Sequence, residues 1–380
     1  MRIAIYCPHY EDPGGVREVT RRLARGLVDG GDRVVLLARA RHAGLGPLPD
    51  RDPDTGAPLW RTRVAPAPLR GSGWRATRQF VRRFPGGAWR LVRQLRAERP
   101  DVVATHCSKR HAPWVLALRA GVGVPIVVHL HNAAQTADGP ESPGLTRLLL
   151  RCATRVIAVS EPVAAYARTI LPSRADRVVC IPNGVEPGEF AGVAPMRRAR
   201  PYVLGVGRLA AQKGFDLLLP AFASAGTDAE LVLAGDGPDR DALVAEASRL
   251  GVADRVTLLG GVDRATVAAL LCGAAVVAMP SRFEGHPLVA LEAMQAGAPL
   301  VATDIPGMPA SLRHGETGWL VPPDDIAALA DALRTLLADP ARARGLGAAA
   351  ARAAADFLGW DAVTARVRAE YATAIAQTRS

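Results

Sequence analysis

The sequence predicts an α/β protein made of two similar domains, each a doubly wound parallel sheet with helices on both faces. Short apolar, β-branched runs alternate with amphipathic helical stretches along the chain, which is the pattern of parallel strands joined by crossover helices. The strands are too many for one ordinary doubly wound sheet, and the pattern starts again near residue 201. Residues 182–201, between the two halves, are rich in Pro and Gly, which is typical of a linker.

The expected strands of the first half are residues 2–7, 33–38, 101–105, 125–130 and 155–159. Those of the second half are residues 202–206, 230–234, 255–259, 275–279, 299–302 and 318–321. Amphipathic helices are expected between them, for example at 16–29, 214–225, 239–250, 263–272 and 324–337. Residues 40–73 are rich in Gly, Pro and Asp and predict a long irregular excursion from the first domain.

Length and composition bound the class of protein. With 380 residues, 49% of them apolar, the chain can bury sizeable cores, which excludes a disordered protein. The five cysteines lie far apart without a C-x-x-C pair, so neither a disulfide scaffold nor a zinc site is predicted. No apolar run is as long as the segment of about 20 residues that is needed to cross a bilayer. Pro8 interrupts the apolar N-terminal segment too early for a secretory signal. A cytoplasmic location is expected.

The net charge of +11 comes almost entirely from arginine and is concentrated in one segment. Nine arginines and a single acid, Glu98, lie between Arg70 and Arg99, and four aromatic residues are interspersed with them: Trp74, Phe80, Phe84 and Trp89. Such a segment suits an anionic membrane surface. A solvated helical face with ordinary core aromatics also explains it. Nucleic acid is not an expected partner, because no nucleic-acid-binding motif accompanies the charge.

The strongest candidate for chemistry is EGHPLVALEAM, residues 284–294, which follows a predicted strand. In open α/β sheets, ligands bind beyond the carboxyl ends of the strands. A helix is expected from about Pro287 to Ala296, and its free N-terminal amides favour anions. Glu284 and Glu292 bracket this helix start and suit a ligand that has both a phosphate and hydroxyl-bearing rings. A capped helix with solvated acids is the alternative.

Two glycine-containing turns hold further candidates. Arg208 and Lys213 lie between a strand and a helix in VGRLAAQKGFDLLLPAF, and two cations near a helix start suit a diphosphate. Ordinary surface charge is the alternative there, and the P-loop pattern is not met. Gly14 and Gly15 open the helix at 16–29, where the backbone either approaches a ligand closely or forms a tight turn.

Three histidines lie at or near the ends of predicted strands. His106 ends the strand at 101–105, and His131, followed by Asn132, falls at the carboxyl end of the strand at 125–130. His129 lies two residues earlier, so its side chain is on the same face of the strand as that of His131, and it is expected in the core. For each histidine, a buried structural role is the alternative to contact with a ligand.

Together these motifs resemble those of the retaining nucleotide-sugar glycosyltransferases of family 4, over nearly the whole chain. Gly14–Gly15–Val16 is similar to the family's first glycine-rich loop, and His106 and His131 to its two strand-end histidines. Further segments match in the family's order: RVIAVSEPVAAY at 155–166 with Ser160 at the strand end, Pro182–Asn183–Gly184–Val185, VGRL…QKGFDLLL, Glu284-x7-Glu292, TDIPGMPASLRHGETGWLVPPDD at 303–325, and Phe357 to Trp360.

The resemblance implies the GT-B fold, an α/β fold in which two Rossmann-like doubly wound domains face each other across a cleft. It implies an acceptor-binding domain at 1–190, a nucleotide-sugar-binding domain at 191–360, and a C-terminal helix at 361–380 that crosses back to the first domain. The implied donor-binding residues are Gly15, Arg208, Lys213, Val262, Gly285, His286, Leu288, Val289 and Glu292. The implied catalytic residues are His131 and Glu284, and the acceptor-side candidates are His106, Asn132 and Ser160.

The resemblance also implies what the donor-binding residues do. Arg208 and Lys213 neutralise the departing diphosphate, on which charge grows in the transition state. Glu292 accepts hydrogen bonds from the ribose, and Val262 lies near the base. Gly15 lets the first-domain loop close over the phosphate.

In the same way, Glu284 and the backbone from Gly285 to Val289 hold the transferred sugar and the distal phosphate, and His131 lies beside the anomeric carbon. The implied reaction is transfer of a sugar from a UDP- or GDP-sugar to a hydroxyl acceptor with retention. No metal or other cofactor is expected, since protein cations take its place. His286 and Pro287 depart from the family's usual residues, which leaves the donor sugar open.

The acceptor is left open between a lipid-linked or cell-envelope glycan and a small natural product. The basic segment from Arg70 to Arg99 suggests a peripheral location at the inner face of the membrane. Two alternatives accompany this prediction. One is a nucleotide-sugar 2-epimerase on the same fold, and the other is a non-catalytic, basic membrane-surface protein that retains the fold.

Overall fold

The computed structural model describes residues 1–12, 14–39, 51–62, 64–68, 73–132 and 143–379. Contacts divide the chain into two compact units. The N-terminal unit comprises Met1–Gly184 and Trp360–Ser380, and the C-terminal unit comprises Val185–Gly359. The boundaries expected from the sequence fall after residues 190 and 360.

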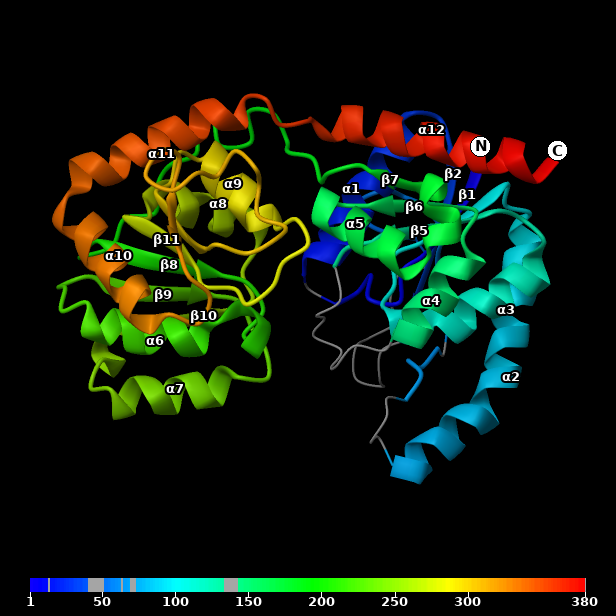
Figure 1. Cartoon of the computed structure of the whole chain (residues 1–380), viewed down its shortest axis with the longest axis horizontal. Helices are drawn as coiled ribbons and strands as arrows, with labels where there is room; N and C mark the ends of the chain where they lie inside the picture. Colours follow the sequence, from blue (N-terminus) through cyan, green and yellow to red (C-terminus); the bar gives the residue numbers. More distant parts are fainter. Residues whose placement is uncertain (13, 40–50, 63, 69–72, 133–142, 380) are drawn as a thin grey trace. The chain divides into compact units, whose positions relative to one another are not determined.

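The N-terminal unit contains a seven-stranded parallel sheet with the order β3-β2-β1-β4-β5-β6-β7 (Figure 1). Its strands are β1 (Arg2–Tyr6), β2 (Arg33–Arg39), β3 (Leu59–Thr62), β4 (Val102–Thr105), β5 (Ile126–Leu130), β6 (Arg155–Ala158) and β7 (Val178–Cys180). Its helices are α1 (Gly15–Asp29), α2 (Gly73–Glu98), α3 (Ala112–Val122), α4 (Pro143–Cys152), α5 (Glu161–Ile170) and α12 (Trp360–Arg379), with short 3-10 turns η1 (Lys109–His111) and η2 (Pro172–Arg177).

The C-terminal unit contains a six-stranded parallel sheet with the order β10-β9-β8-β11-β12-β13. Its strands are β8 (Tyr202–Val206), β9 (Glu230–Ala234), β10 (Val256–Gly260), β11 (Val276–Met279), β12 (Leu300–Thr303) and β13 (Trp319–Val321). Its helices are α6 (Phe215–Ser224), α7 (Arg240–Arg249), α8 (Arg264–Gly273), α9 (Leu288–Gln295), α10 (Ile326–Ala338) and α11 (Pro340–Ala354), with 3-10 turns η3 (Ala211–Lys213) and η4 (Ala253–Arg255).

The predicted fold of two parallel-sheet, Rossmann-like domains is confirmed. Every strand expected from the sequence is present, with ends shifted by at most one residue. The additional strands β3 and β7 are the two edge strands of the first sheet. The helix expected from about Pro287 to Ala296 is α9, in which these two residues are the caps.

Both faces of the second sheet are buried, as a parallel sheet requires. Successive residues of β8 show this, because Val203 packs into one apolar core and Leu204 into the other. Helices α6, α7 and α10 cover one face, α8 and α9 lie on the other (Figure 1), and α11 contributes residues to both cores. The central strands of the sheet are therefore buried, and the loops at their ends are left to form a site.

The last helix, α12, packs on α1 of the N-terminal unit. A Cβ placed on Gly26 would lie 2.6 Å from Oγ1 of Thr364, so the glycine allows a close approach of the two helices. Arg368 donates to the buried carboxylate of Asp32 at 2.7 Å. These contacts bring residues far apart in the sequence into one domain.

The strand order identifies one special position in each sheet. It reverses between β1 and β4 in the N-terminal unit and between β8 and β11 in the C-terminal unit. Ligands of doubly wound sheets bind beyond the carboxyl ends of the strands at such a switch point. A ligand-binding site is therefore expected at the loops that follow these four strands.

Candidate active site

The loop after β8 contains two of the predicted donor-binding residues, Arg208 and Lys213. A Cβ on Gly207 would lie 3.1 Å from Cε of Lys213, so the lysine stem lies directly over this glycine. Gly214 has φ 68°, and a Cβ there would lie 1.9 Å from the carbonyl oxygen of Pro280. Only glycine permits this close contact with the loop that follows β11.

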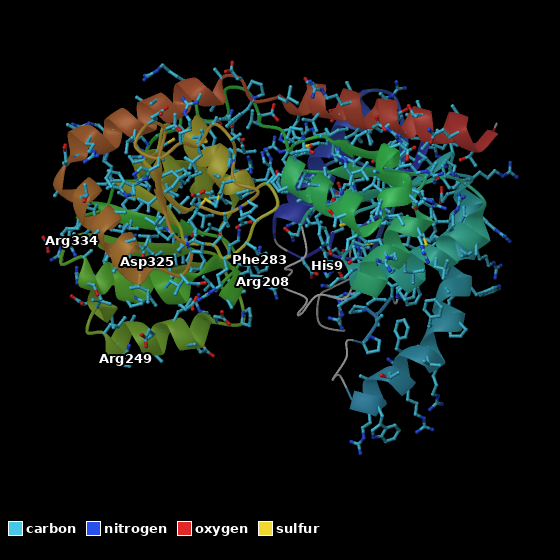
Figure 2. All side chains as sticks on the ribbon, in the orientation of Figure 1. His9, Arg208, Arg249, Phe283, Asp325 and Arg334 are labelled. Atoms are coloured by element: carbon cyan, nitrogen blue, oxygen red, sulfur yellow. The ribbon has the colours of Figure 1, made fainter. Side chains whose placement is uncertain are left out.

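The loop after β11 runs from Pro280 to Pro287 and is hydrogen-bonded to the first loop. The amide of Arg282 donates to the carbonyl of Gln212 at 2.9 Å. The Gln212 side chain donates to the carbonyl of Phe283 at 3.1 Å. Figure 2 labels Arg208 and Phe283, one on each of these two adjoining loops. The two loops at the switch point are thus held together by hydrogen bonds.

Lys213 and Glu284 are in direct contact across these loops. The lysine Nζ lies 2.6 Å from Oε1 of Glu284, which also accepts a hydrogen bond from Oγ of Ser281 at 2.8 Å. The side chain of Glu284 is only 7% exposed and that of Lys213 is 19% exposed. An ammonium and a carboxylate are therefore held at fixed positions where water is largely excluded, which strengthens their interaction with any further charge. Arg208 is exposed in the same loop.

The N-terminus of α9 lies directly after Glu284, Gly285 and His286. The helix begins at Leu288 without a side-chain cap. The first amide to donate to the N-cap carbonyl of Pro287 is that of Ala290, so the amides of Leu288 and Val289 are left to favour an anion. Gly307 has φ 98°, and a Cβ there would lie 2.3 Å from the carbonyl oxygen of Glu284. The backbone of residues 284–285 is thus covered by a neighbouring loop. Burial lowers the pKa of His286 to about 4, so this imidazole is neutral at physiological pH.

Glu292 lies on α9 and pairs with an arginine that the sequence analysis did not single out. Arg264, at the start of α8, donates to Oε1 of Glu292 at 3.0 Å. The same guanidinium donates to Glu189, with Nη2 2.6 Å from Oε2. Val262, two residues before Arg264, is half-buried against the core beneath α8 and α9. The segment GGVDR that includes Val262 also contains Arg264, which is the signal that could have identified it.

In the N-terminal unit, Gly14 and Gly15 open helix α1 and are both exposed. Gly14 has φ 149°, and a Cβ on either glycine meets no described atom within 4 Å. Crowding within the described part of the unit therefore does not require glycine at position 15, in contrast to Gly214.

The strand-end histidines are brought together. Nδ1 of His106 lies 3.0 Å from Nε2 of His131. His129 stacks on His106 with a centroid distance of 4.0 Å, and its Nε2 contacts the hydroxyl of Tyr371 on α12 at 2.8 Å. Burial lowers the pKa of His106 and His129 well below 6.5 and that of His131 to about 4. Tyr371 is a second residue that the sequence analysis did not single out, since 242 positions separate it from His129.

The other acceptor-side candidates lie near the same edge of the sheet. Ser160 follows β6 and is the N-cap residue of α5, yet its buried Oγ has no hydrogen-bond partner among the described residues. Asn132 is half-buried and directly follows His131. The structure therefore brings His106 and His131 into contact, with Asn132 next in the chain, and places Ser160 after β6, the strand beside β5.

The basic segment forms most of helix α2, and its aromatic residues fall into two groups. Phe80 and Phe84 pack against Trp114 of α3, with centroid distances of 6.3 and 4.8 Å. Trp74 and Trp89 are 66% and 61% exposed, with arginine guanidinium groups over their rings. Arg70 lies outside the described residues. Across the described parts of the chain, every helix is too short or too polar to span a bilayer.

Comparison with known proteins agrees with this architecture. Residues 13–189 match the family model described as "Glycosyltransferase Family 4", and residues 193–353 match "Glycosyl transferases group 1". The phosphatidyl-myo-inositol mannosyltransferase of Mycobacterium leprae is 32% identical over 98% of this chain and 97% of its own length. The D-inositol 3-phosphate glycosyltransferase of Xylanimonas cellulosilytica is 30% identical over 97% of this chain and 93% of its own length.

Solved structures show the same fold. Sucrose-phosphate synthase from Thermosynechococcus elongatus superposes with a TM-score of 0.80 at 23% identity, over 99% of this chain and 100% of that one. Anabaena HepE in complex with UDP and glucose superposes with a TM-score of 0.77 at 21% identity, over 98% of this chain and 100% of that one. Two Rossmann-like domains of this kind define the GT-B class of glycosyltransferases. Within that class, the chain belongs to glycosyltransferase family 4.

Proposed function

We propose that this glycosyltransferase takes its sugar from a nucleoside diphosphate sugar, such as a UDP- or GDP-sugar, that binds at the switch point of the C-terminal unit. The observation that supports the proposal best is the contact of Lys213 with Glu284 directly before the N-terminus of α9. A fixed ammonium, the exposed Arg208 and the free amides of a helix start are a set of groups that suits a diphosphate. The solved complexes of HepE with UDP and UDP-glucose support the same ligand class.

In this proposal each group has a separate task. Lys213 and Arg208 stabilise the charge that grows on the diphosphate as the bond from the anomeric carbon to the phosphate oxygen breaks. Glu284 and the amides from Gly285 to Val289 hold the sugar and the distal phosphate. Glu292, held by Arg264, accepts hydrogen bonds from the ribose hydroxyls, and Val262 lies near the base.

We further propose that transfer occurs with retention and without a metal ion. The acceptor oxygen bonds to the anomeric carbon on the face that the diphosphate leaves, and the acceptor proton passes to the departing phosphate oxygen. His131 lies beside the anomeric carbon, and Gly15 allows the backbone at the start of α1 to approach the phosphate. Because cationic side chains and amides stabilise the leaving group, no divalent cation is needed.

The proposed acceptor is a hydroxyl group of a lipid-linked or cell-envelope glycan or of a small natural product, bound on the side of Asn132 and Ser160. His106, an acceptor-side candidate from the sequence, is fully buried and so does not contact the acceptor directly. Two relatives are named for inositol 3-phosphate and phosphatidyl-myo-inositol. A third is named for the kanosaminyl group that it transfers, which does not identify an acceptor. The exposed Trp74 and Trp89 among the arginines of α2 favour a site at the inner, cytoplasmic face of an anionic membrane.

One experiment tests the reaction. The purified chain is incubated with each of a panel of nucleotide sugars, with and without candidate acceptors, and the products are analysed by NMR. The proposal predicts nucleoside diphosphate release that depends on the acceptor, and a product with the anomeric configuration of the donor. Release of a rearranged free sugar without an acceptor would indicate a 2-epimerase instead. No turnover of any donor, together with binding to anionic vesicles, would indicate a non-catalytic membrane-surface protein.

A further inference from the structure

The hydrogen bond between His106 and His131 determines which nitrogen of His131 carries a proton. The two residues follow the neighbouring strands β4 and β5, and Nδ1 of His106 lies 3.0 Å from Nε2 of His131. Burial lowers the pKa of both imidazoles, so each ring is neutral and has one N–H at physiological pH. One ring must donate to the other, and two assignments are available.

The surroundings of His106 distinguish these assignments. His106 is 0% exposed, and its Nε2 has no hydrogen-bond partner within the described part of the chain. If His131 donated from Nε2, the proton of His106 would be on its own Nε2, as a buried N–H without a partner. If His106 donates from Nδ1, only a lone pair is left unpaired. Unpaired buried N–H groups are the rarer of the two, which favours donation from His106.

The ring of His106 is also held in its plane. His129 stacks on it at a centroid distance of 4.0 Å and an interplanar angle of 19°. The hydroxyl of Tyr371, which is itself fully buried on α12, contacts Nε2 of His129 at 2.8 Å. The donor nitrogen of His106 is therefore kept in one direction by packing that reaches the last helix.

We propose that His106 is a positioning residue that donates from Nδ1 to Nε2 of His131 and so fixes His131 as the Nδ1–H tautomer. The inference rests on the proposed function, in which His131 lies beside the anomeric carbon. In this tautomer His131 offers the reacting sugar an N–H donor. Its one lone-pair nitrogen is already occupied by His106, so His131 cannot accept the proton of the acceptor hydroxyl. That proton leaves with the diphosphate.

Nitrogen NMR of the full-length protein labelled with 15N-histidine tests the proposal, because protonated and unprotonated ring nitrogens have distinct shifts and couplings. The His131 signals are assigned by their loss in His131→Asn. The expected result for the wild-type protein is a protonated Nδ1 and an unprotonated Nε2 on His131. In His106→Phe, which keeps an aromatic ring but removes the donor, His131 is expected to gain the Nε2–H form. The control His111→Phe alters another buried histidine of the same unit and is expected to leave the His131 pattern unchanged.

A wild-type His131 with its proton on Nε2 would overturn the proposal, and this spectrum decides the matter even if His106→Phe fails to fold. In the activity assay, His106→Phe is expected to lower kcat on the order of tenfold or more, with a smaller change in the KM for the donor. Donor turnover with the opposite tautomer would refute the inference and leave the proposed function intact. The expected tautomer without donor turnover would refute the proposed function and leave the hydrogen-bond assignment intact.

Discussion

Nζ of Lys213 lies 2.6 Å from Oε1 of Glu284, although the two residues are 71 positions apart in the sequence. They meet because β8 and β11 are neighbours at the point where the strand order reverses. The contact places a cation and an anion side by side. In the proposed complex the lysine binds the diphosphate, and the glutamate binds the sugar.

Lys213→Ala is expected to weaken donor binding by about tenfold or more. The reason is the loss of a charge-assisted hydrogen bond, which contributes about 1.5–3 kcal/mol. Binding of the donor is measured by calorimetry, and folding is checked by circular dichroism. Arg249→Ala is the matched control, since Arg249 also pairs with a glutamate at 2.6 Å but lies on the exposed surface of α7 (Figure 2). Equal donor affinity in Lys213→Ala and the wild type would refute the role of this lysine.

Glu292→Gln is expected to weaken nucleoside diphosphate binding on the order of tenfold and to leave inorganic pyrophosphate binding nearly unchanged. The carboxylate is expected to accept hydrogen bonds from ribose hydroxyls, which pyrophosphate lacks. Competition binding with both ligands makes the comparison. Glu189→Gln is the control, because Glu189 shares the guanidinium of Arg264 but lies outside α9. A parallel loss of both ligands in Glu292→Gln would show that the effect is not ribose recognition.

Glycosyl transfer is expected to persist after treatment with EDTA. In the proposed site, Lys213, Arg208 and the amides at the start of α9 provide the charge stabilisation that a divalent ion otherwise provides. Initial rates are compared before and after chelation, with added Mn²⁺ or Mg²⁺ as a third condition. Loss of activity with EDTA and its return with either ion would contradict the metal-free mechanism.

Replacing Arg78, Arg82 and Arg93 by Glu is expected to reduce binding to vesicles that contain anionic lipids. All three side chains are exposed on α2, beside the exposed Trp74 and Trp89. Each basic residue near an anionic surface contributes about 1 kcal/mol, and the substitution reverses that attraction. Cosedimentation with phosphatidylglycerol vesicles measures the effect.

The control for this membrane prediction changes the net charge by the same amount elsewhere. Arg344, Arg352 and Arg366 are exposed on α11 and α12, and the three are replaced by Glu together. If the two triple variants bind vesicles equally well, the attraction depends on total charge, and α2 is not the membrane-binding surface.

The free energy of unfolding is expected to fall as the pH decreases from about 6.5 to about 4. Burial lowers the pKa of His131 and His286 to about 4 and that of His111 to about 3 in the folded state. The unfolded chain, with histidine pKa values near 6.5, therefore binds more protons over this interval, and stability must rise with pH there. Urea unfolding at successive pH values measures the slope. A flat profile between pH 4.5 and 6.5 would show that these histidines are not buried in the neutral form.

Much of the fold could be predicted from the sequence, because apolar strands buried on both faces are unambiguous when helices alternate with them. The two strands that were not predicted, β3 and β7, are short edge strands whose residues are incompletely buried. A run of three or four residues, such as LWRT in a segment rich in Gly and Pro, has too little periodicity to predict a strand. Their formation depends on the neighbouring strand.

The site could be predicted only in part for a similar reason. Residues directly after strands were identified, since the carboxyl ends of parallel strands share one edge of the sheet. Arg264 and Tyr371 were not, because their importance depends on tertiary contacts with Glu292 and His129. The resemblance implies that the last helix crosses back to the first domain, but nothing in the local sequence around Tyr371 indicates that its hydroxyl contacts His129.

Calorimetric titration of the wild-type chain with UDP, GDP and their sugar conjugates tests the central claim most directly. The account predicts that at least one nucleoside diphosphate binds with one site per chain and raises the melting temperature. It also predicts that Lys213→Ala weakens this binding while Arg249→Ala does not. Absence of binding by every nucleotide, or equal binding by the two variants, would contradict the assignment of the loops after β8 and β11 as the donor site.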